Sequence, residues 1–284
     1  MTGFSADWLA LREPYDVSGR NPAVLDALAA AFADRASVAV VDLACGAGAT
    51  RRAIASRLPR RQNWRLVDND RALLARAARP APAAGVDVTL LAIDLARDLE
   101  SALAEPVDLV TLSALLDLVS AGWLDRLALA IAGRGLPVYA ALTYDGRVAF
   151  EPVDTLDASV IAAVNQHQRG DKGFGPALGP TATAEAIARF ETSGYAIVQG
   201  VSDWNFGGLD RAIQSDLLAG WGAAAREVGS LAPSEIDGWL VRRHDWVASG
   251  RSSMRVGHID FFARPIGARR AAKSQSNNSS PSSG

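Results

Sequence analysis

Residues 38–50 combine a short apolar run with a turn of small residues, an arrangement that can bind part of a nucleotide. The run over residues 38–43 is rich in valine, which is typical of a strand buried on both faces of a parallel sheet. Asp42 lies near its end, and three small residues follow at alternate positions: Ala44, Gly46 and Gly48. Small residues let the backbone turn tightly and let a ligand approach closely. The carboxylate of Asp42 would suit an ammonium group of that ligand.

Two common phosphate-binding patterns do not fit this turn. A dinucleotide fingerprint needs G-x-G-x-x-G, whereas Gly46 and Gly48 have no third glycine at Arg51, and Ala44 stands where a further glycine could precede them. No Gly-Lys-Ser/Thr follows, which excludes a P-loop. A nicotinamide-dependent oxidoreductase is therefore disfavoured. A tight turn without a ligand stays open as the alternative to a nucleotide site.

The elements that would position this turn alternate between strand and helix. Apolar runs predict further strands over residues 63–67, 86–93, 107–112 and 136–142. Helices are predicted between them, over residues 50–58, 71–79, 98–104 and 123–132. This β-α-β order predicts a parallel sheet covered by helices, with its ligand at the carboxyl ends of the strands.

Polar residues fall at those strand ends. Asp68, followed by Asn69, lies about 20 residues beyond the glycine turn, where a nucleotide fold places a carboxylate for the ribose hydroxyls. Asp94 and Leu95 end the next strand, where a side-chain acceptor and an adjacent backbone group could read an adenine amino group. Ser113 ends the strand after that. We predict that all of these residues bind the cofactor.

The order and spacing of these residues resemble the motifs of the class I S-adenosylmethionine (SAM) methyltransferases, whose first motif reads acidic-x-Gly/Ala-x-Gly-x-Gly. The resemblance covers residues 36–145, 184–204 and 255–264. It implies an α/β fold, Rossmann-like and doubly wound, with a mostly parallel seven-stranded sheet and a reversed last strand. It also implies SAM as the cofactor, with Asp68 rather than Asp70 at the ribose.

The chain is expected to divide into a nucleotide-binding domain and added helical segments. Residues 1–35 are predicted to form an N-terminal helical lid, and residues 36–266 the SAM-binding domain. Two cap insertions are expected in that domain, over residues 145–182 and 205–252. Residues 267–284 are rich in Arg and then in Ser and Asn, a composition that predicts a disordered tail.

Three charged residues cluster in the N-terminal segment: Arg12, Asp16 and Arg20. They precede a helix predicted over residues 23–32. A short helical turn near the start of the chain is expected to end at Glu13-Pro14. The cluster has two interpretations. It would form a solvated, ion-paired surface turn, or it would belong to a lid over the cofactor in which Arg20 binds the cofactor's carboxylate.

Candidate catalytic residues are few. His167 lies near the end of a helix predicted in the first insertion, and Tyr144 follows the fifth strand. Three charged residues follow His167 in a loop expected to bind the acceptor: Arg169, Asp171 and Lys172. A structural role at the end of the helix competes with catalysis for His167. A structural or surface role likewise competes with catalysis for His258, in the last predicted strand.

Four tryptophans lie in or beside the second insertion: Trp204, Trp221, Trp239 and Trp246. They would pack the inserted helices against each other, or form an aromatic wall for a planar or cationic acceptor. No metal site is predicted, because a single cysteine excludes a cysteine-based zinc site.

Composition narrows the function further. The 284 residues are 49% hydrophobic and 21% charged, which is ordinary for a soluble globular protein. A net charge of -2 gives no electrostatic case for binding nucleic acid or an anionic membrane. The chain has no apolar run long enough to span a bilayer and does not begin like a secretory signal, so we expect it in the cytoplasm.

These observations lead to one functional hypothesis and one alternative. We expect a SAM-dependent methyltransferase of the EC 2.1.1 class that acts on O or N of a small-molecule acceptor. The alternative is a SAM-binding regulatory or interaction protein without turnover. The partner is expected to be the small molecule, without nucleic acid or membrane, and a homodimer is left open.

Overall fold

One mixed sheet runs through the part of the chain that the structure describes. The structure is a computed structural model, and it describes residues 4–79, 82–104 and 106–267. The strand order is β3-β2-β1-β4-β5-β8-β6, with β7 paired to β8. The strands are β1 (Ser37–Leu43), β2 (Arg61–Asp68), β3 (Val86–Ala92), β4 (Leu109–Ser113), β5 (Val138–Glu151), β6 (Tyr195–Val201), β7 (Trp204–Phe206) and β8 (Ser253–Pro265).

Strand direction agrees with the predicted fold class. β1 to β5 pair with one another in parallel, whereas β8 runs antiparallel to β5, β6 and β7. The mostly parallel α/β sheet with a reversed last strand is thereby confirmed. β7 is an additional short strand that the sequence analysis missed. Asp42 lies opposite Thr111 in the register of β1 and β4, so these two strands end side by side.

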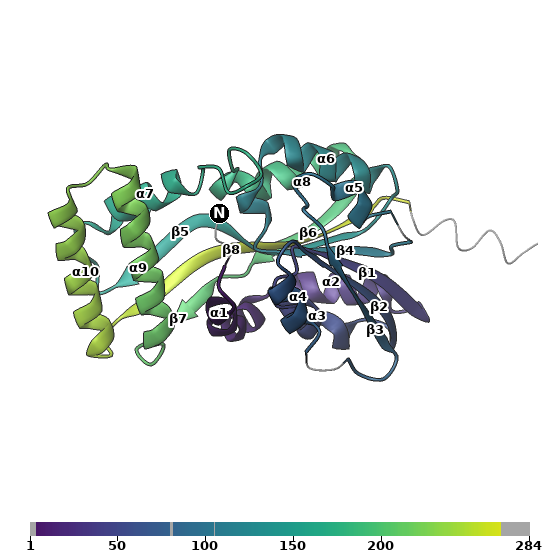
Figure 1. Cartoon of the computed structure of the whole chain (residues 1–284), viewed down its shortest axis with the longest axis horizontal. Coiled ribbons are helices and arrows are strands. Elements are labelled where there is room, and N and C mark those ends of the chain that lie inside the picture. Colours follow the sequence, from purple (N-terminus) through teal and green to yellow (C-terminus); the bar gives the residue numbers. More distant parts are fainter. Residues whose placement is uncertain (1–3, 80–81, 105, 268–284) are drawn as a thin grey trace, which may run out of the picture.

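Helices cover both faces of the sheet (Figure 1). Their bounds are α1 (Ala6–Gly19), α2 (Pro22–Phe32), α3 (Ala49–Ile54), α4 (Arg71–Ala77), α5 (Leu99–Ala102), α6 (Ala121–Ala132), α7 (Asp157–His167), α8 (Ala182–Thr192), α9 (Arg211–Val228) and α10 (Pro233–Ala248), with short 3-10 turns η1 (Ala55–Arg57), η2 (Leu116–Leu118) and η3 (Gly179–Thr181). One apolar core joins α5, α6 and α8 to the sheet, and a second joins α2, α3 and α4 to its other face.

β5 and β8 form a long ribbon that carries a helical cap, made of α7, α9 and α10 (Figure 1). The fifth strand was predicted over residues 136–142, but it continues to Glu151, so residues 145–151 are strand and not part of an insertion. The sequence Asp145-Gly146 looks like a turn. The sheet accommodates it instead as a register shift between Tyr144 and Val148, with Gly146 at a φ of +86°.

α1 corrects a second expectation, because Pro14 lies inside this helix and does not end it. Proline removes one helical hydrogen bond and crowds the preceding turn. Contacts on both sides of Pro14 hold the helix together nonetheless. Glu13 forms an ion pair with Arg52 of α3, and Tyr15 donates to Asp210 at 2.6 Å. Tertiary contacts therefore outweigh the local signal.

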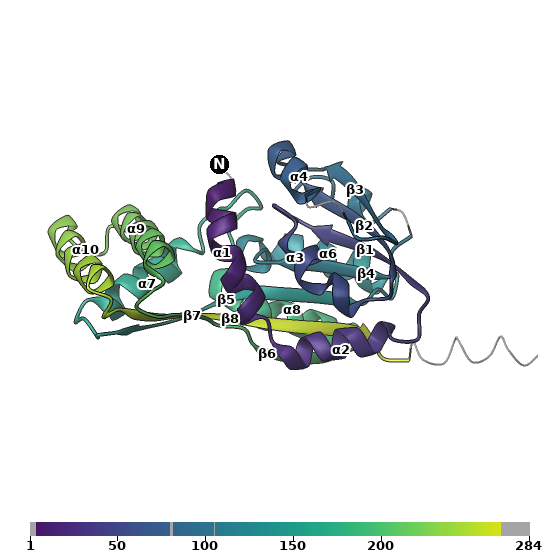
Figure 2. The same ribbon diagram turned by 90° about the horizontal axis from the view of Figure 1, so that it is seen from below.

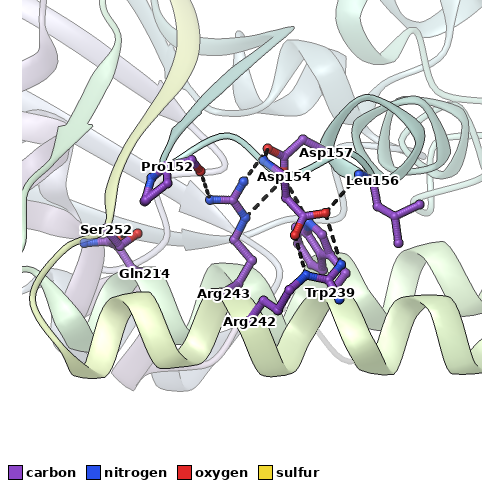
Figure 3. Close-up of polar contacts among 9 residues, drawn as sticks. All are labelled: Pro152, Asp154, Leu156, Asp157, Gln214, Trp239, Arg242, Arg243 and Ser252. Carbon is purple, nitrogen blue, oxygen red and sulfur yellow. Dashed lines mark hydrogen bonds and ion pairs between the residues drawn. The ribbon is translucent and has the colours of Figure 1, made fainter.

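A buried ionic network fastens α10 to the segment between β5 and α7 (Figure 3). Arg243 is fully buried and donates to both oxygens of Asp157 and, at 2.7 Å, to the carbonyl of Pro152. The indole of Trp239 also donates to Asp157, at 2.9 Å. Arg242 pairs with Asp154 at 2.5 Å. The cap is thus tied to the ribbon by polar contacts as well as by its own apolar core.

Across residues 4–267, apart from the short undescribed gaps, no helix is long and apolar enough to cross a membrane. The tail predicted to be disordered, residues 267–284, lies outside the described residues except for Gly267.

Candidate functional site

The turn after β1 has the backbone that the sequence predicted. Ala44, Gly46 and Gly48 have φ values of +51°, +52° and +79°, in the left-handed region that favours glycine. A Cβ at Gly48 would lie 3.0 Å from the Cβ of Ala77, so this glycine lets α3 begin close against α4. A Cβ at Gly46 would instead meet the side chain of Leu9 at 3.3 Å. α1 therefore lies directly over the glycine turn.

Asp42 is a buried carboxylate with one oxygen free. The residue is 0% exposed, and Thr111 donates to its Oδ1 at 2.7 Å. Its Oδ2 has no hydrogen-bond partner. Burial raises the pKa of Asp42 to about 7, while the Thr111 hydroxyl and the charge of Arg20 oppose the rise. Such a group is suited to a cationic ligand, as the sequence analysis predicted.

Asp68 connects the end of β2 to the glycine turn. Its Oδ2 accepts from the amide of Gly46 at 2.8 Å, and its Oδ1 accepts from the amide of Asp70 at 2.9 Å. Burial raises its pKa. Asp70 has a different role, because its carboxylate caps α4. Asn69, between them, is exposed. The assignment of Asp68 to the ribose stays a prediction, and the cap function of Asp70 favours it.

Asp94 and Leu95, which follow β3, differ in their exposure to solvent. Asp94 is exposed, and its Oδ1 accepts from the amide of Ala96 at 3.0 Å. Leu95 is buried in the core, and its carbonyl accepts from the indole of Trp123 at 2.7 Å. The adenine contact predicted for Leu95 would therefore fall to its backbone amide. Phe174, from the loop after α7, packs edge-on against Trp123 at 5.3 Å.

The cluster of Arg12, Asp16 and Arg20 is buried, which excludes the solvated surface turn. Arg12, Asp16 and Arg20 are 8%, 4% and 4% exposed. Arg12 and Asp16 are four residues apart and lie on one face of α1, and Arg20 follows directly after the helix end. Arg20 donates to the hydroxyl of Tyr139 at 2.9 Å and to that of Ser113 at 3.4 Å. The structure thus brings Arg20 and Ser113 together, beside the ends of β4 and β5.

α1 is connected to both halves of the molecule (Figure 2). Glu13 binds the guanidinium of Arg52 through both oxygens, at 2.6 and 2.7 Å. On the other side, the Tyr15 hydroxyl donates to Asp210, at the start of α9. α1 also contacts β7. The helix predicted as a lid therefore bridges the nucleotide-binding half and the cap.

Two residues that sequence reasoning did not select lie next to α1. Asp117, in η2 just after β4, is 6% exposed, and its Oδ1 has no partner. Burial raises the pKa of Asp117 to about 6, opposed by the charge of Arg12. His258 of β8 is also buried, and burial together with Arg12 lowers its pKa to about 3, so it is neutral. The sequence signal that could have identified Asp117 is its position as an acidic residue within an otherwise apolar run, residues 115–119.

Together these side chains form what we call the buried polar cluster: Arg12, Asp16, Arg20, Asp42, Asp117, His258 and Asp260. Asp260 is structural, since it accepts from the amides of Leu142 at 2.7 Å and Asn21 at 3.0 Å. Apart from Asp260 and Arg12, each member carries a polar atom without a partner. These atoms are Asp16 Oδ1, Arg20 Nε, Asp42 Oδ2, Asp117 Oδ1 and His258 Nδ1. Unpaired buried polar atoms are costly, so this density of them marks a ligand site.

The loop predicted to bind the acceptor makes contacts with α9 and within itself. His167 contacts Glu227 of α9 through Nε2 at 3.0 Å and Lys172 through Nδ1 at 3.3 Å. Asp171 accepts from two glycine amides of its own loop. Arg169 is exposed. The structure therefore joins His167 to Lys172, while the acceptor-binding role of the loop stays a prediction.

Tyr144 lies nearer to the buried polar cluster but is a poor candidate for a base. Its hydroxyl donates to Asn165 at 2.8 Å. Burial raises its pKa, and the charges of Asp145 and Asp117 raise it further. Its ring packs edge-on against His258, with the centroids 6.1 Å apart. The geometry thus favours a wall of the site over proton transfer. No group of His, Cys, Asp and Glu within the described residues could hold a metal ion.

Comparison with solved structures supports the fold. The chain is similar to a cyclopropane-fatty-acyl-phospholipid synthase-like protein from Lactobacillus casei, with 15% identity, a TM-score of 0.51, and 92% of this chain and 95% of that chain covered. It is also similar to a SAM-dependent methyltransferase from Thiobacillus denitrificans in complex with S-adenosylhomocysteine, with 19% identity, a TM-score of 0.43, and 93% and 100% covered. At 15% identity, the first similarity shows a shared fold.

Comparison with sequences adds a family. No curated protein matches the chain. Residues 40–132, from β1 to the end of α6, match a family model described as a methyltransferase domain. The match includes the glycine turn and the predicted ribose and adenine residues, and it supports SAM as the cofactor. Residues 40–132 are therefore similar to a methyltransferase domain, and they lie on a mostly parallel sheet of the Rossmann-like type.

Proposed function

We propose that this protein transfers the methyl group of SAM to O or N of a small-molecule acceptor, as an enzyme of the EC 2.1.1 class. The observation that carries the proposal is the set of unpaired polar atoms of the buried polar cluster, beside the glycine turn. Asp42 offers an unpaired carboxylate oxygen and Arg20 an unpaired guanidinium nitrogen. These are complementary to the ammonium and carboxylate groups of one amino-acid ligand.

The remaining predicted contacts suit the rest of the same ligand. Asp68 and Asn69 would bind the ribose, and Asp94 with the amide of Leu95 the adenine. The small residues at Ala44 and Gly46 leave room for close approach. SAM supplies an activated methyl group when bound. The protein's own contribution is to align the acceptor with that group and to exclude water, and alignment alone can be worth ~7–11 kcal/mol.

The buried polar cluster, rather than the loop after α7, is the better place for the acceptor. Through Arg20 it adjoins Ser113 at the ends of the central strands, where ligands of such sheets bind. His167 is held between Glu227 and Lys172 instead. A catalytic role for His167 and Tyr144, and acceptor binding by Arg169, Asp171 and Lys172, remain secondary hypotheses.

Calorimetry with SAM, S-adenosylhomocysteine and NAD tests the binding step. We expect both sulfur compounds to bind and NAD not to bind. Incubation with methyl-labelled SAM and a cell metabolite extract tests the transfer step. Label in a small-molecule product supports the enzyme. Tight SAM binding without any transfer would support the alternative, a regulatory SAM-binding protein, and absence of SAM binding would overturn both.

A further inference from the structure

We propose that Asp117 binds the acceptor through a protonated amine and takes up its proton, so that the protein methylates nitrogen. This inference rests on the proposed methyl transfer and specifies its acceptor. Asp117 follows β4 directly, at the same edge of the sheet as Asp42. Its exposed fraction is only 6%, and its Oδ1 has no partner among the described residues. Such a carboxylate lacks a hydrogen-bond donor that a ligand could supply.

The walls around Asp117 suit a cation. Arg12 and Tyr144 both lie close enough to Asp117 to affect its protonation. The ring of His258 packs against two other aromatic rings, 4.6 Å from Trp204 and 6.1 Å from Tyr144. The guanidinium of Arg12 already lies over the Trp204 ring, 5.3 Å from its centroid. Aromatic faces attract positive charge, and the contact of Arg12 with Trp204 is an example of this at the wall.

The local charge also favours a cationic acceptor over an anionic one. Arg12 is paired with Asp16 at 2.9 Å, so Asp117 shares the charge of this guanidinium and otherwise accepts from the backbone amide of Tyr144, with Oδ1 left unpaired. Asp16 keeps a second unpaired oxygen, Oδ1. His258 adds no charge, because burial keeps it neutral. A carboxylate or phosphate acceptor would meet the unpaired Oδ1 of Asp117 here, whereas an ammonium group would pair with it.

The reaction then balances without a further reactant. The protonated amine of the acceptor gives one proton to Asp117 Oδ1 and becomes nucleophilic. Its lone pair forms a bond to the methyl carbon of SAM, and the carbon–sulfur bond breaks with its electrons on sulfur. The products are a methylated ammonium compound and S-adenosylhomocysteine, and Asp117 releases its proton to water. Burial raises the pKa of Asp117 to about 6, closer to neutral pH than for an ordinary aspartate, as a general base requires.

Labelled SAM and a cell metabolite extract divided by cation exchange test the proposal. With wild-type protein, label should enter compounds retained by the cation exchanger and not those that pass through. Asp117→Asn should lower that transfer ~10²–10⁴-fold, the usual contribution of a general base. Its affinity for SAM by calorimetry should change less than about threefold, since we assign no cofactor contact to Asp117.

Two further variants complete the experiment. Asp216→Asn, an exposed aspartate on α9, is the matched control and should transfer as wild type does. Asp117→Glu keeps the charge and should retain more transfer than Asp117→Asn. Label confined to the unretained fraction, or Asp117→Asn active within about threefold of wild type, would overturn the inference and leave the proposed function standing. Absence of label from both fractions would overturn both proposals, and the SAM titration would then show whether binding or transfer fails.

Discussion

At the scale of single residues, Asp68 and Asp70 can be separated by one pair of variants. Asp68→Ala should weaken SAM binding by ~1.5–3 kcal/mol, the usual range for a hydrogen bond to a charged group. Asp70→Ala should instead lower stability by ~0.5–2 kcal/mol through loss of the cap of α4, with little effect on SAM binding. Calorimetry and urea unfolding measure both. If Asp68→Ala binds SAM as wild type does, the ribose assignment is wrong.

His167 has a competing structural explanation that the structure makes specific. It joins Glu227 of α9 to Lys172, and it lies at the end of α7, where a basic residue is favourable. We therefore expect His167→Ala to change stability by about 1 kcal/mol or less, as for a surface ion pair. Methyl transfer should stay within about threefold of wild type, and Arg169→Ala and Lys172→Ala should behave alike. A loss of ~10²-fold or more in any of the three would return the loop to the active site.

The site residues that could be predicted from sequence are those defined by local pattern. The turn at residues 44–48 has a fixed spacing and needs small residues, so it was visible in the chain alone. Asp117 and His258 were not selected, because their chemistry arises only when α1 covers the end of β4 and β8. Arg20 was visible as a charge, but its burial was not, since that depends on Tyr139 and Ser113, far along the chain.

At the scale of elements, the alternating strands and helices were predictable, whereas two departures were not. The sequence predicts that the fifth strand ends at residue 142, before Asp145-Gly146, a pair common in turns. Only pairing with β8, over a hundred residues away, extends it. Pro14 was read as a helix breaker, but contacts of Glu13 with Arg52 and of Tyr15 with Asp210 hold α1. In both cases non-local contacts outweigh a correct local preference.

The attachment of the cap gives a prediction at this same scale. Asp157→Ala would leave Arg243, which is 0% exposed, without its carboxylate (Figure 3). Removing one partner of a buried ion pair typically costs ~3–5 kcal/mol. The matched control is Asp237→Ala, an aspartate of α10 that is 63% exposed and pairs with Arg226 of α9. Its loss should cost about 1 kcal/mol or less.

Urea unfolding followed by tryptophan fluorescence and by circular dichroism measures the cap directly. Trp221, Trp239 and Trp246 lie on its helices, so their fluorescence reports its packing. In Asp157→Ala the fluorescence transition should move to lower urea than the transition of the whole molecule. Equal stability of Asp157→Ala and Asp237→Ala would show that apolar packing alone holds the cap.

At the scale of the whole molecule, the buried polar cluster makes stability depend on pH in two opposite ways. Burial raises the pKa of Asp42 to about 7 and that of Asp117 to about 6. Between about pH 4 and these values the folded state holds protons that the unfolded state has lost, so stability falls as pH rises. Burial lowers the pKa of His258 to about 3. Between about pH 3 and its unfolded value, the unfolded state binds the extra proton, so stability rises with pH.

Asp117→Asn isolates one of these contributions. The amide cannot ionise, so the variant avoids the cost of a buried charge. Relative to wild type, its free energy of unfolding should be unchanged below about pH 4 and should increase progressively up to about pH 6. Above that pH the gain should level at up to about 3 kcal/mol, the equivalent of a shift from 3.8 to about 6. Urea unfolding of Asp117→Asn, wild type and Asp216→Asn across this range measures it. A stability difference independent of pH would mean that Asp117, beside Arg12 and Tyr144, titrates as an ordinary aspartate in the folded protein.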